Sequence, residues 1–197
     1  YSPRDHVSRF WSKCQRDTDL YGAWNGVPID KKEAARYYKK AAEKGHIDAM
    51  FKYGYMLLYG IGVQIDKRKA SFYFKTAADN GQTEAMFNYG WMLSQGDIVQ
   101  ANQEESCRYY KMAAEKGHVN AMNNYAFKLL KGNGVKTDKE EALKYFKLAA
   151  DKGQIRSMFN YGWMMNNGEG TEVNKKEASL YFKKAADKGY TDAMKSY

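Results

Sequence analysis

The sequence predicts an all-α solenoid of antiparallel helix pairs with an exact 36-residue repeat. Residues 85–93 read Ala-Met-Phe-Asn-Tyr-Gly-Trp-Met-Leu, and this stretch returns almost unchanged at 157–165, with looser copies at 49–57 and 121–129. Double alanines recur in the same register, each pair followed three residues later by Gly45, Gly81, Gly117, Gly153 or Gly189. Self-similarity at this period is typical of a solenoid in which each repeat is one helix pair.

Residues 1–29 form a degraded copy of the repeat. A shift by one repeat places Asp17 where the other copies have tyrosine, and a carboxylate there suits a surface that faces water. We therefore predict an N-terminal arm and a degenerate or capping helix; an eroded repeat with more chain before it is the equal alternative. Residues 30–197 form the repeat array. Because the chain opens on Tyr1 and ends inside another copy, we interpret it as a piece of a longer protein whose array continues beyond 197.

The second helix of each repeat carries the double alanine. We predict these helices at 31–44, 67–80, 103–116, 139–152 and 175–188, because each follows an N-cap side chain: Asp30, Asp66, Asn102, Asp138 or Asn174. A glutamate three residues after the cap predicts a capping box at Glu33, Glu105, Glu141 and Glu177, whereas Lys69 breaks it once. The glycine after the helix provides the left-handed residue that ends it.

The first helix of each repeat carries the Met-Phe-Asn-Tyr-Gly pattern. We predict these helices at 47–59, 83–95, 119–131 and 155–167, each closed by Gly60, Gly96, Gly132 or Gly168. A second glycine follows at Gly62, Gly134 and Gly170, and Ile98 replaces it once, so that loop is expected to differ in shape. With 3.6 residues per turn, Met86, Tyr89, Gly90 and Leu93 share one arc, which must face the partner helix.

The pattern of one full repeat runs Ala49, Gly54, Gly60, Gly62, Val63, Asp66, Ala70, Tyr73, Phe74, Ala77, Ala78 and Gly81. It resembles the Sel-1-like repeat family, relatives of the tetratricopeptide repeat, over residues 30–197. Tyrosine stands where that family usually has leucine before its glycine. The resemblance implies a right-handed superhelix with the first helices lining the concave side. It also implies adaptor or scaffold roles without catalytic activity in the repeat.

The arc of the first helix opposite the core is the candidate partner-binding surface on the concave face. We call the equivalent positions of successive repeats a column. An exposed arc is expected to be charged, yet three columns of this arc are rich in aromatic or amide side chains. The rings are Tyr55, Trp91, Phe127 and Trp163, flanked by Phe51, Phe87 and Phe159; beside them stand Lys52, Asn88, Asn124 and Asn160; the last column holds Tyr59, Gln95, Lys131 and Asn167. Amides suit a peptide backbone and rings suit side chains, which suggests a groove for an extended peptide. Ordinary packing between successive repeats explains the same columns, and both interpretations stay open.

The net charge of +9 does not by itself indicate nucleic-acid binding. The second helices near both ends are basic, but those in the middle are neutral, whereas a surface that follows a nucleic-acid backbone needs a continuous stripe. Solvated lysines explain the charge more simply. Acidic protein surfaces remain possible partners for the basic ends.

No cofactor, metal site or catalytic set is expected. His46 and His118 share one column, which we interpret as a polar loop position, and the Gly-X-Gly pairs follow helices and lack the Gly-Lys-Ser/Thr ending of a phosphate loop. Cys14 and Cys107 have no zinc-site spacing. We therefore expect no enzyme activity, and rank an adaptor first and a structural component of a large assembly, such as a cytoskeletal filament, second.

The composition indicates an intracellular, cytoplasmic protein. No apolar run reaches the roughly 18 to 20 residues of a membrane span, and no signal segment opens the chain. The two distant cysteines and the absence of an Asn-X-Ser/Thr acceptor favour a reducing compartment. The family resemblance also allows the lumen of the endoplasmic reticulum.

Overall fold

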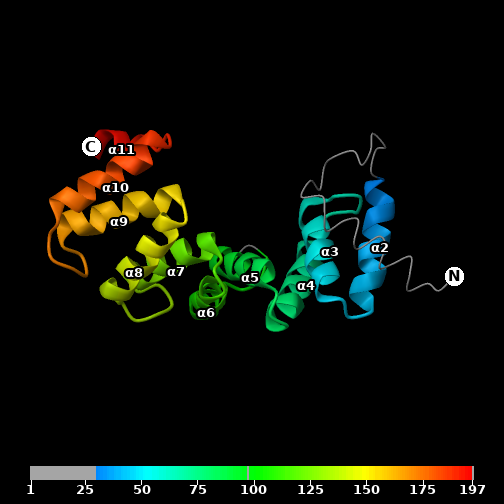
Figure 1. Cartoon of the computed structure of the whole chain (residues 1–197). Helices are drawn as coiled ribbons and strands as arrows, with labels where there is room; N and C mark the ends of the chain where they lie inside the picture. Colours follow the sequence, from blue (N-terminus) through cyan, green and yellow to red (C-terminus); the bar gives the residue numbers. More distant parts are fainter. Residues whose placement is uncertain (1–29, 97, 197) are drawn as a thin grey trace. The chain divides into compact units, whose positions relative to one another are not determined.

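The computed structural model describes residues 30–96 and 98–196, and these ranges contain helices and turns but no strand. The all-α class is therefore confirmed (Figure 1). The helices are α2 (Lys31–Glu43), α3 (Ile47–Tyr59), α4 (Lys67–Asp79), α5 (Thr83–Gln95), α6 (Gln103–Glu115), α7 (Val119–Lys131), α8 (Lys139–Asp151), α9 (Ile155–Asn167), α10 (Lys175–Asp187) and α11 (Thr191–Ser196). The predicted degenerate copy at 1–29 lies outside the described residues.

The predicted helix boundaries hold closely. All four first helices begin and end at the predicted residues, and each second helix ends one residue earlier than predicted. The earlier end has a local cause, because a lysine such as Lys152 (φ −82°, ψ 6°) already leaves helical geometry before Gly153 turns left-handed at φ 91°. Apart from this one-residue difference, the helices α2 to α10 begin and end at the predicted residues.

Two compact units divide the chain at residues 77 and 78, and each is described by itself. In the first unit α2 packs on α3, and the middle of α4 contacts α3 through rings. The Tyr53 and Tyr73 rings meet edge to face with centroids 5.2 Å apart. A Cβ at Gly54 would lie 3.2 Å from the Phe74 ring, so this position needs a small residue for the two helices to approach.

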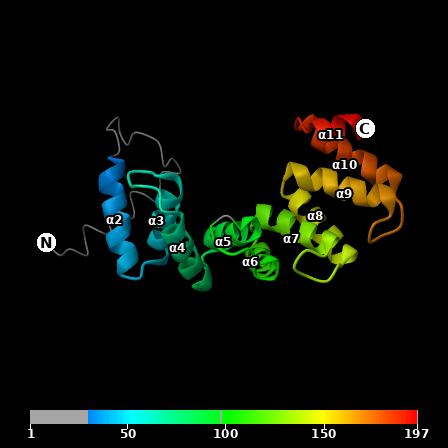
Figure 2. The ribbon, with the colours of Figure 1, turned by 180° about the vertical axis from the view of Figure 1, so that it is seen from behind.

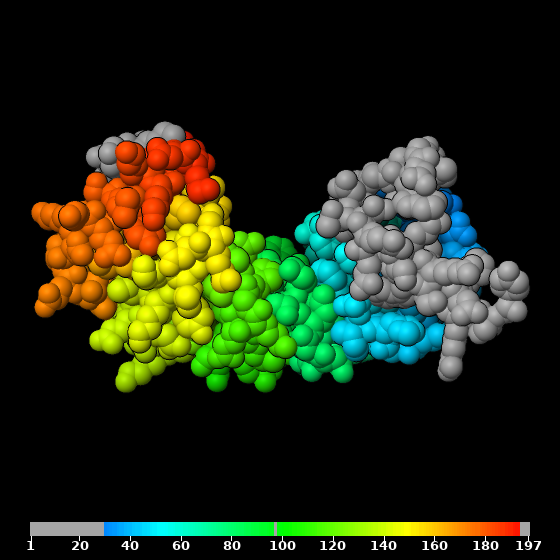
Figure 3. All heavy atoms as spheres, in the orientation of Figure 1, coloured from blue at the N-terminus to red at the C-terminus, as the bar shows by residue number. Residues whose placement is uncertain are grey.

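In the second unit the helices pack in chain order. Helix α5 pairs with α6, α7 with α8 and α9 with α10, while α6 also packs on α7 and α8 on α9 (Figures 1 and 2). Side chains fill the spaces between these ribbons (Figure 3). The core residues on the first helices are those of the predicted arc, with Met86 at 1%, Tyr89 at 6% and Leu93 at 3% exposure. The solenoid pattern of consecutive antiparallel pairs is thus confirmed in this unit.

The second glycine of the inter-helix loop is required by a close approach of two backbones. A Cβ at Gly134 would collide with the Gln103 carbonyl at the start of α6, and one at Gly170 would collide with the Lys139 carbonyl at the start of α8. Both glycines also have positive φ, 79° and 75°. The loop after each of these first helices therefore lies directly on the first turn of the preceding second helix.

The predicted N-caps form, but the capping box forms only by half. Asp138 accepts the N–H of Glu141 at 2.8 Å, and Asn174 accepts that of Glu177 at 3.0 Å. The predicted second bond of the box, from the N–H of the cap residue to the glutamate side chain, does not form at these two helices. The N–H of Asp138 donates to Leu129 O instead, and the N–H of Asn174 donates to Met165 O. The preceding first helix takes this donor, and the glutamate is left to accept from a tyrosine instead.

Candidate functional site

Three large rings of the predicted aromatic column are exposed in the second unit. Trp91 on α5, Phe127 on α7 and Trp163 on α9 are 40%, 49% and 39% exposed. They occupy the same position in their helices, one repeat apart. Since a core ring would be enclosed by its neighbours, these side chains present apolar surface to water that the fold does not cover.

Helices α5, α7 and α9 are lateral neighbours, as their side-chain contacts demonstrate. The Phe87 ring of α5 stacks on His118 at the start of α7, with centroids 4.5 Å apart and planes 20° apart. Between α7 and α9, the buried Ser157 Oγ donates to Asn123 Oδ1 at 3.0 Å. The three exposed rings therefore stand at equivalent positions on first helices that touch one another near their N-terminal ends.

The asparagine column lies beside these rings and is half buried. Asn88 Nδ2 donates to Glu84 O at 2.7 Å, and Asn160 Nδ2 lies 3.5 Å from Asn123 Oδ1. The Asn124 Oδ1 accepts from Asn123 at 3.3 Å. An amide offers two N–H groups and one carbonyl. Asn124 is also hydrogen-bonded to the Tyr110 hydroxyl, so bonds within the protein orient these amides.

The remaining predicted column continues the neutral character of this surface. Gln95 and Asn167 are exposed, and Asn167 donates to Trp163 O at 2.8 Å. Lys131 Nζ lies 5.9 Å from the centroid of the Phe127 ring. We call the following nine residues the first-helix face: Asn88, Trp91, Gln95, Asn124, Phe127, Lys131, Asn160, Trp163 and Asn167.

The flanking phenylalanines lie between helices. Phe87 packs on Tyr110 at 5.8 Å as well as on His118, and Phe159 packs on Phe182 at 5.5 Å and on Tyr190 at 5.2 Å. Both are half buried. They support the helices that carry the first-helix face and present little surface of their own.

In the first unit the corresponding residues cluster on α3. Tyr55 lies 4.5 Å from Tyr59 and 6.4 Å from Phe51, measured between ring centroids. Lys52 Nζ lies 5.7 Å from the Phe51 centroid. Tyr59 is 55% exposed, so this unit has an aromatic surface of its own.

Sequence reasoning missed Asn123, which replaces the phenylalanine found at positions 51, 87 and 159. Asn123 is 9% exposed and is bonded to Ser157, which replaces the alanine of the other repeats. The two changes compensate each other, because a buried amide without a partner would be costly. The replacement of phenylalanine by asparagine at position 123 is the feature of the sequence that could have indicated this pair.

His118 is more than the predicted loop position. It stands at the N-cap of α7, where its Nδ1 accepts the N–H of Ala121 at 3.0 Å and its Nε2 lies 3.2 Å from Glu84 Oε2. Its ring is stacked on Phe87. His118 therefore joins α5 to α7 and is committed to the fold.

Two buried tyrosines, Tyr161 on α9 and Tyr181 on α10, bond through their hydroxyls to carboxylates of neighbouring helices. Tyr161 donates to Glu177 at 2.8 Å and Tyr181 donates to Asp151 at 2.9 Å. Burial first, and then these acidic partners, raise the pKa of both tyrosines. Lys147 donates to the Tyr181 hydroxyl at 3.3 Å. Since a raised pKa keeps the phenols protonated, they act as structural donors and are poor nucleophiles.

A buried lysine occupies a core column. Lys128 is 5% exposed, stands where the other first helices have Met56, Met92 and Met164, and donates to Gln103 Oε1 at 2.7 Å. Burial lowers the pKa of this lysine and raises the pKa of the nearby Cys107 thiol, a free cysteine. Both side chains are buried, with Cys107 at 4% exposure.

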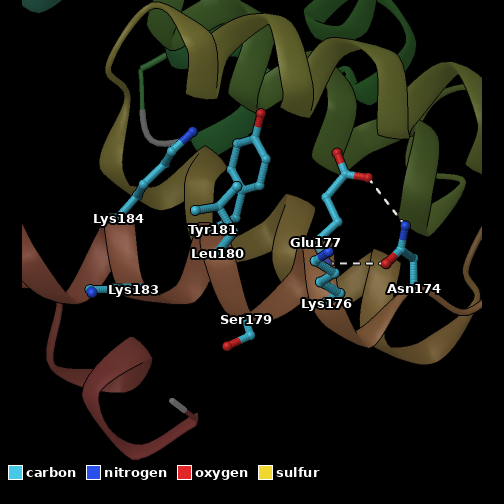
Figure 4. A pocket seen from close by; sticks show the side chains of 8 residues that line it. All are labelled: Asn174, Lys176, Glu177, Ser179, Leu180, Tyr181, Lys183 and Lys184. Atoms are coloured by element: carbon cyan, nitrogen blue, oxygen red, sulfur yellow. Dashed lines mark hydrogen bonds between the residues drawn. The ribbon is translucent and has the colours of Figure 1, made fainter.

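An open depression of about 520 Å³ runs along α10 (Figure 4). Its lining residues are Asn174, Lys176, Glu177, Ser179, Leu180, Tyr181, Lys183 and Lys184. Tyr181 and Glu177 point toward the neighbouring helices and are engaged in the bonds described above. Across the described ranges no three His, Cys, Asp or Glu side chains are grouped to hold a metal ion. No helix in those ranges is long and apolar enough to span a bilayer.

A family model described as Sel1 repeat matches residues 19–46, 47–82, 83–118, 119–154 and 155–190. From residue 83 onward each matched segment holds one first helix and the following second helix. No curated protein matches the chain.

Solved structures share this fold. A Sel1 repeat protein from Oxalobacter formigenes is 33% identical with a TM-score of 0.77, and the match covers 87% of this chain and 70% of that one. The protein c5321, a protective antigen present in uropathogenic Escherichia coli strains, is 28% identical with a TM-score of 0.81, and the match covers 85% of this chain and 36% of c5321. Immunity protein Pa5087 from Pseudomonas aeruginosa has the same fold at 22% identity and a TM-score of 0.51, over 98% of this chain and 69% of its own.

Proposed function

Because this chain belongs to the Sel1 repeat family, whose members generally act in protein–protein interaction, we propose that it is a non-catalytic adaptor. In this proposal the first-helix face binds a protein segment or an extended peptide. The main support is the exposure of Trp91, Phe127 and Trp163, each between 39% and 49%, at equivalent positions of α5, α7 and α9. The α3 cluster of Tyr55 and Tyr59 is a second contact surface of the same kind.

Interface energetics support this choice of surface. Tryptophan is enriched among residues that dominate binding, and truncating such a ring typically costs about 2 kcal/mol or more of affinity. The centre of an interface is typically aromatic and poor in charge. The first-helix face has this composition, with Lys131 as its single charged residue.

The amides support the same proposal through their preorganisation. Asn88 and Asn167 are each fixed by a bond to a carbonyl of their own helix. A ligand that bonds to their remaining groups does not have to immobilise them, and preorganised groups lower the entropic cost of binding.

The charge distribution adds a prediction about association. Helix α10 is rich in exposed lysine, at Lys175, Lys176, Lys183 and Lys184. Such a basic surface accelerates association with an acidic partner at low salt. We further propose an intracellular location, which the free Cys107 thiol supports.

A second candidate is a structural component bound on several faces by a large assembly. Exposed apolar residues on the second helices favour it, with Phe72 at 65%, Leu148 at 48% and Leu180 at 50% exposure. Locking by several faces would require these residues as well as the first-helix face. The two candidates therefore differ in which substitutions abolish binding.

The test is selection from a displayed library of random peptides on the purified chain. Selected peptides are then measured against Trp91→Ala/Trp163→Ala and against the matched control Leu148→Ala/Leu180→Ala. Binding that is lost in the tryptophan variant and kept in the control supports the adaptor. Loss only in the leucine variant contradicts it, as does a failure to select any peptide.

A further inference from the structure

We infer that helix α10 carries a second interaction site, which binds an acidic protein segment with an apolar side chain between its carboxylates. Four exposed residues form this site, Lys176, Leu180, Lys183 and Lys184, and we call them the α10 stripe. The inference goes beyond the proposed function, because the stripe shares no residue with the first-helix face. It follows from the positions of these residues within one helix, their exposure and their unpaired charge.

The four residues lie along one side of α10. Positions 176, 180, 183 and 184 follow the spacing i, i+4, i+7 and i+8, which places side chains on the same face of a helix. With a rise of about 1.5 Å per residue, Lys176 and Lys184 lie about 6 Å before and after Leu180 along the helix axis. All four residues line the open depression along this helix (Figure 4). An apolar side chain, 50% exposed, is therefore flanked by ammonium groups on both sides.

The lysines of the α10 stripe form no ion pair with any carboxylate in residues 30–96 and 98–196. In the preceding repeat Lys147, the equivalent of Lys183, pairs with Asp151 one turn later at 3.8 Å. The equivalent pair of Lys183 with Asp187 does not form. Glu177, the one carboxylate that lines the depression, is half-buried and accepts a hydrogen bond from a tyrosine of α9. The positive charge of the stripe is therefore available to a partner.

Lys184 is held in place beside Leu180. Its Nζ lies 4.4 Å from the centroid of the buried Tyr181 ring. That ring is itself fixed, because its hydroxyl donates to Asp151 at 2.9 Å. Contact with an aromatic face orients an ammonium group and does not neutralise it. A lysine oriented in this way loses less side-chain entropy when a carboxylate binds to it.

The residues at these columns differ from one second helix to the next. Helix α8 has Glu140 and Leu148 where α10 has the two outer lysines, so it has two fewer cations and one more carboxylate there. Helix α4 has an exposed apolar centre in Phe72, but Thr76 stands in place of Lys184. Among the second helices α2, α4, α6, α8 and α10, only α10 surrounds an exposed apolar side chain with three lysines.

A following repeat does not cover this part of a second helix. Helix α8 is followed by the α9–α10 pair, yet Lys144, the equivalent of Leu180, is exposed. Leu148, the equivalent of Lys184, is 48% exposed. The α10 stripe is therefore on an outward surface of the array and is not a packing face between repeats.

The chemistry of the stripe favours an acidic protein segment over a nucleic acid. A phosphate backbone is bound by a continuous series of cations, whereas here an apolar side chain stands at the centre. In an extended peptide, residues two apart point to the same side and lie about 6.6 Å apart. This is close to the spacing of about 6 Å along the stripe. A segment of the form Glu-X-Leu-X-Glu therefore places its leucine on Leu180 and its carboxylates near the outer lysines.

The experiment uses fluorescence anisotropy with the full chain and two short fluorescein-labelled peptides. One contains Glu-Ser-Leu-Ser-Glu, and the other has serine in place of the leucine. The α10 variant, Lys176→Glu/Lys184→Leu, introduces the residues that α8 has at these columns, so it should fold. The α2 control, Lys32→Glu/Lys40→Leu, makes the same changes at the equivalent positions of α2 and alters the net charge equally.

We expect the leucine peptide to bind at least about tenfold more weakly to the α10 variant, because attractive contacts are lost and a like charge is introduced. The α2 control and Trp91→Ala/Trp163→Ala should keep wild-type affinity. The serine peptide should bind several-fold more weakly than the leucine peptide. Affinity should also fall as salt rises from about 0.1 M to about 1 M, because the Debye length falls from roughly 10 Å to roughly 3 Å.

The inference is overturned if the leucine peptide does not bind, if the α10 variant keeps wild-type affinity, or if the α2 control loses as much affinity. Equal binding of the two peptides also overturns it. So does tighter binding, through the same lysines, of a labelled oligonucleotide or of phosphatidylserine vesicles. Loss of binding in Trp91→Ala/Trp163→Ala overturns it as well, because the peptide would then bind the first-helix face, and the proposed adaptor function survives that result.

The same measurements separate the two sites in the peptide selection. A selected peptide that binds the α10 stripe should lose affinity at high salt and in the α10 variant. A ligand of the first-helix face should keep its affinity in both, because that face has little charge and shares no residue with the stripe.

Discussion

The Tyr161 hydroxyl donates a 2.8 Å hydrogen bond to the Glu177 carboxylate, which joins the first and second helices of one repeat. The Tyr161 ring also meets the Tyr181 ring at 4.5 Å in an edge-to-face contact. Tyr125 and Glu141 repeat the bond at 3.4 Å. The tyrosine that stands in place of the family's usual leucine therefore adds a hydrogen bond between the two helices of each of these repeats.

We predict that Tyr161→Phe lowers the free energy of unfolding by about 1.5–2 kcal/mol, because a hydrogen bond to a charged group is lost while the ring contact remains. Denaturant unfolding monitored by circular dichroism measures this change. Tyr59→Phe is the matched control, since this exposed hydroxyl contributes no bond to the fold, and it should change stability by less than about 0.5 kcal/mol. Equal stability of wild type and Tyr161→Phe would show that the Tyr161–Glu177 hydrogen bond does not stabilise the fold.

Alkaline pH should destabilise the chain through its tyrosines. Burial raises the pKa of Tyr125, Tyr161 and Tyr181, and acidic neighbours add to the effect. The unfolded state loses these protons near pH 10 while the folded state keeps them. Stability is therefore full below about pH 10 and falls as the pH rises further. Unfolding titrations between about pH 8 and 11 measure the slope, which should be shallower in Tyr161→Phe; an unchanged slope in that variant would refute the assignment.

Replacement of the buried Lys128 by the methionine of the other repeats should stabilise the chain. Lys128→Met removes a desolvated ammonium and keeps the side-chain volume, so we expect a gain of about 1 kcal/mol, or roughly 2–4 °C in Tm. Lys131→Met, at an exposed site on the same helix, is the control.

The pH dependence of this gain follows from the lowered pKa of Lys128. Below the folded-state pKa both states are protonated and the folded state carries the full desolvation cost. As the pH rises toward the unfolded value near 10.4, the folded state loses its proton first and the cost decreases. The advantage of Lys128→Met should therefore shrink with rising pH, and a constant or growing advantage would count against burial as the cause.

Two glycines with similar backbone angles should respond differently to alanine. Gly153→Ala meets open space at φ 91° and should cost about 1–2 kcal/mol from backbone strain alone. Gly134→Ala has the same strain at φ 79° and also collides with the Gln103 carbonyl, so we expect about 3 kcal/mol or more. Equal costs in denaturant unfolding would show that the loop can move away from α6.

Local signals were sufficient for the helices. The glycines at both helix ends and the Asp or Asn caps are read directly from the repeat, and Gly60 and Gly168 end α3 and α9 as predicted. The capping box failed because its second bond competes with a tertiary one, the Asn174 N–H to Met165 O, which no local pattern reveals.

The candidate site was predictable in outline only. Periodicity placed Trp91 and Trp163 on the arc opposite the core, and their exposure agrees with that position. It could not indicate that Asn123 pairs with Ser157 or that Lys128 is buried against Gln103, since each partner lies in a neighbouring repeat. The repeat shows which positions are equivalent. A residue that differs from the others at such a position can be explained only when the structure shows which residue it contacts.

The affinity of a selected peptide for Trp91→Ala/Trp163→Ala tests the central claim most directly, with thermal melting measured on the same samples. We expect an affinity loss of at least about tenfold, with a cooperative transition retained, because these rings are partly exposed and each should cost less stability than the roughly 3–5 kcal/mol of a fully buried ring. Leu148→Ala/Leu180→Ala should keep wild-type affinity. Wild-type affinity in the tryptophan variant would show that these rings do not bind the peptide, and a loss of the folded state would show that they are part of the core.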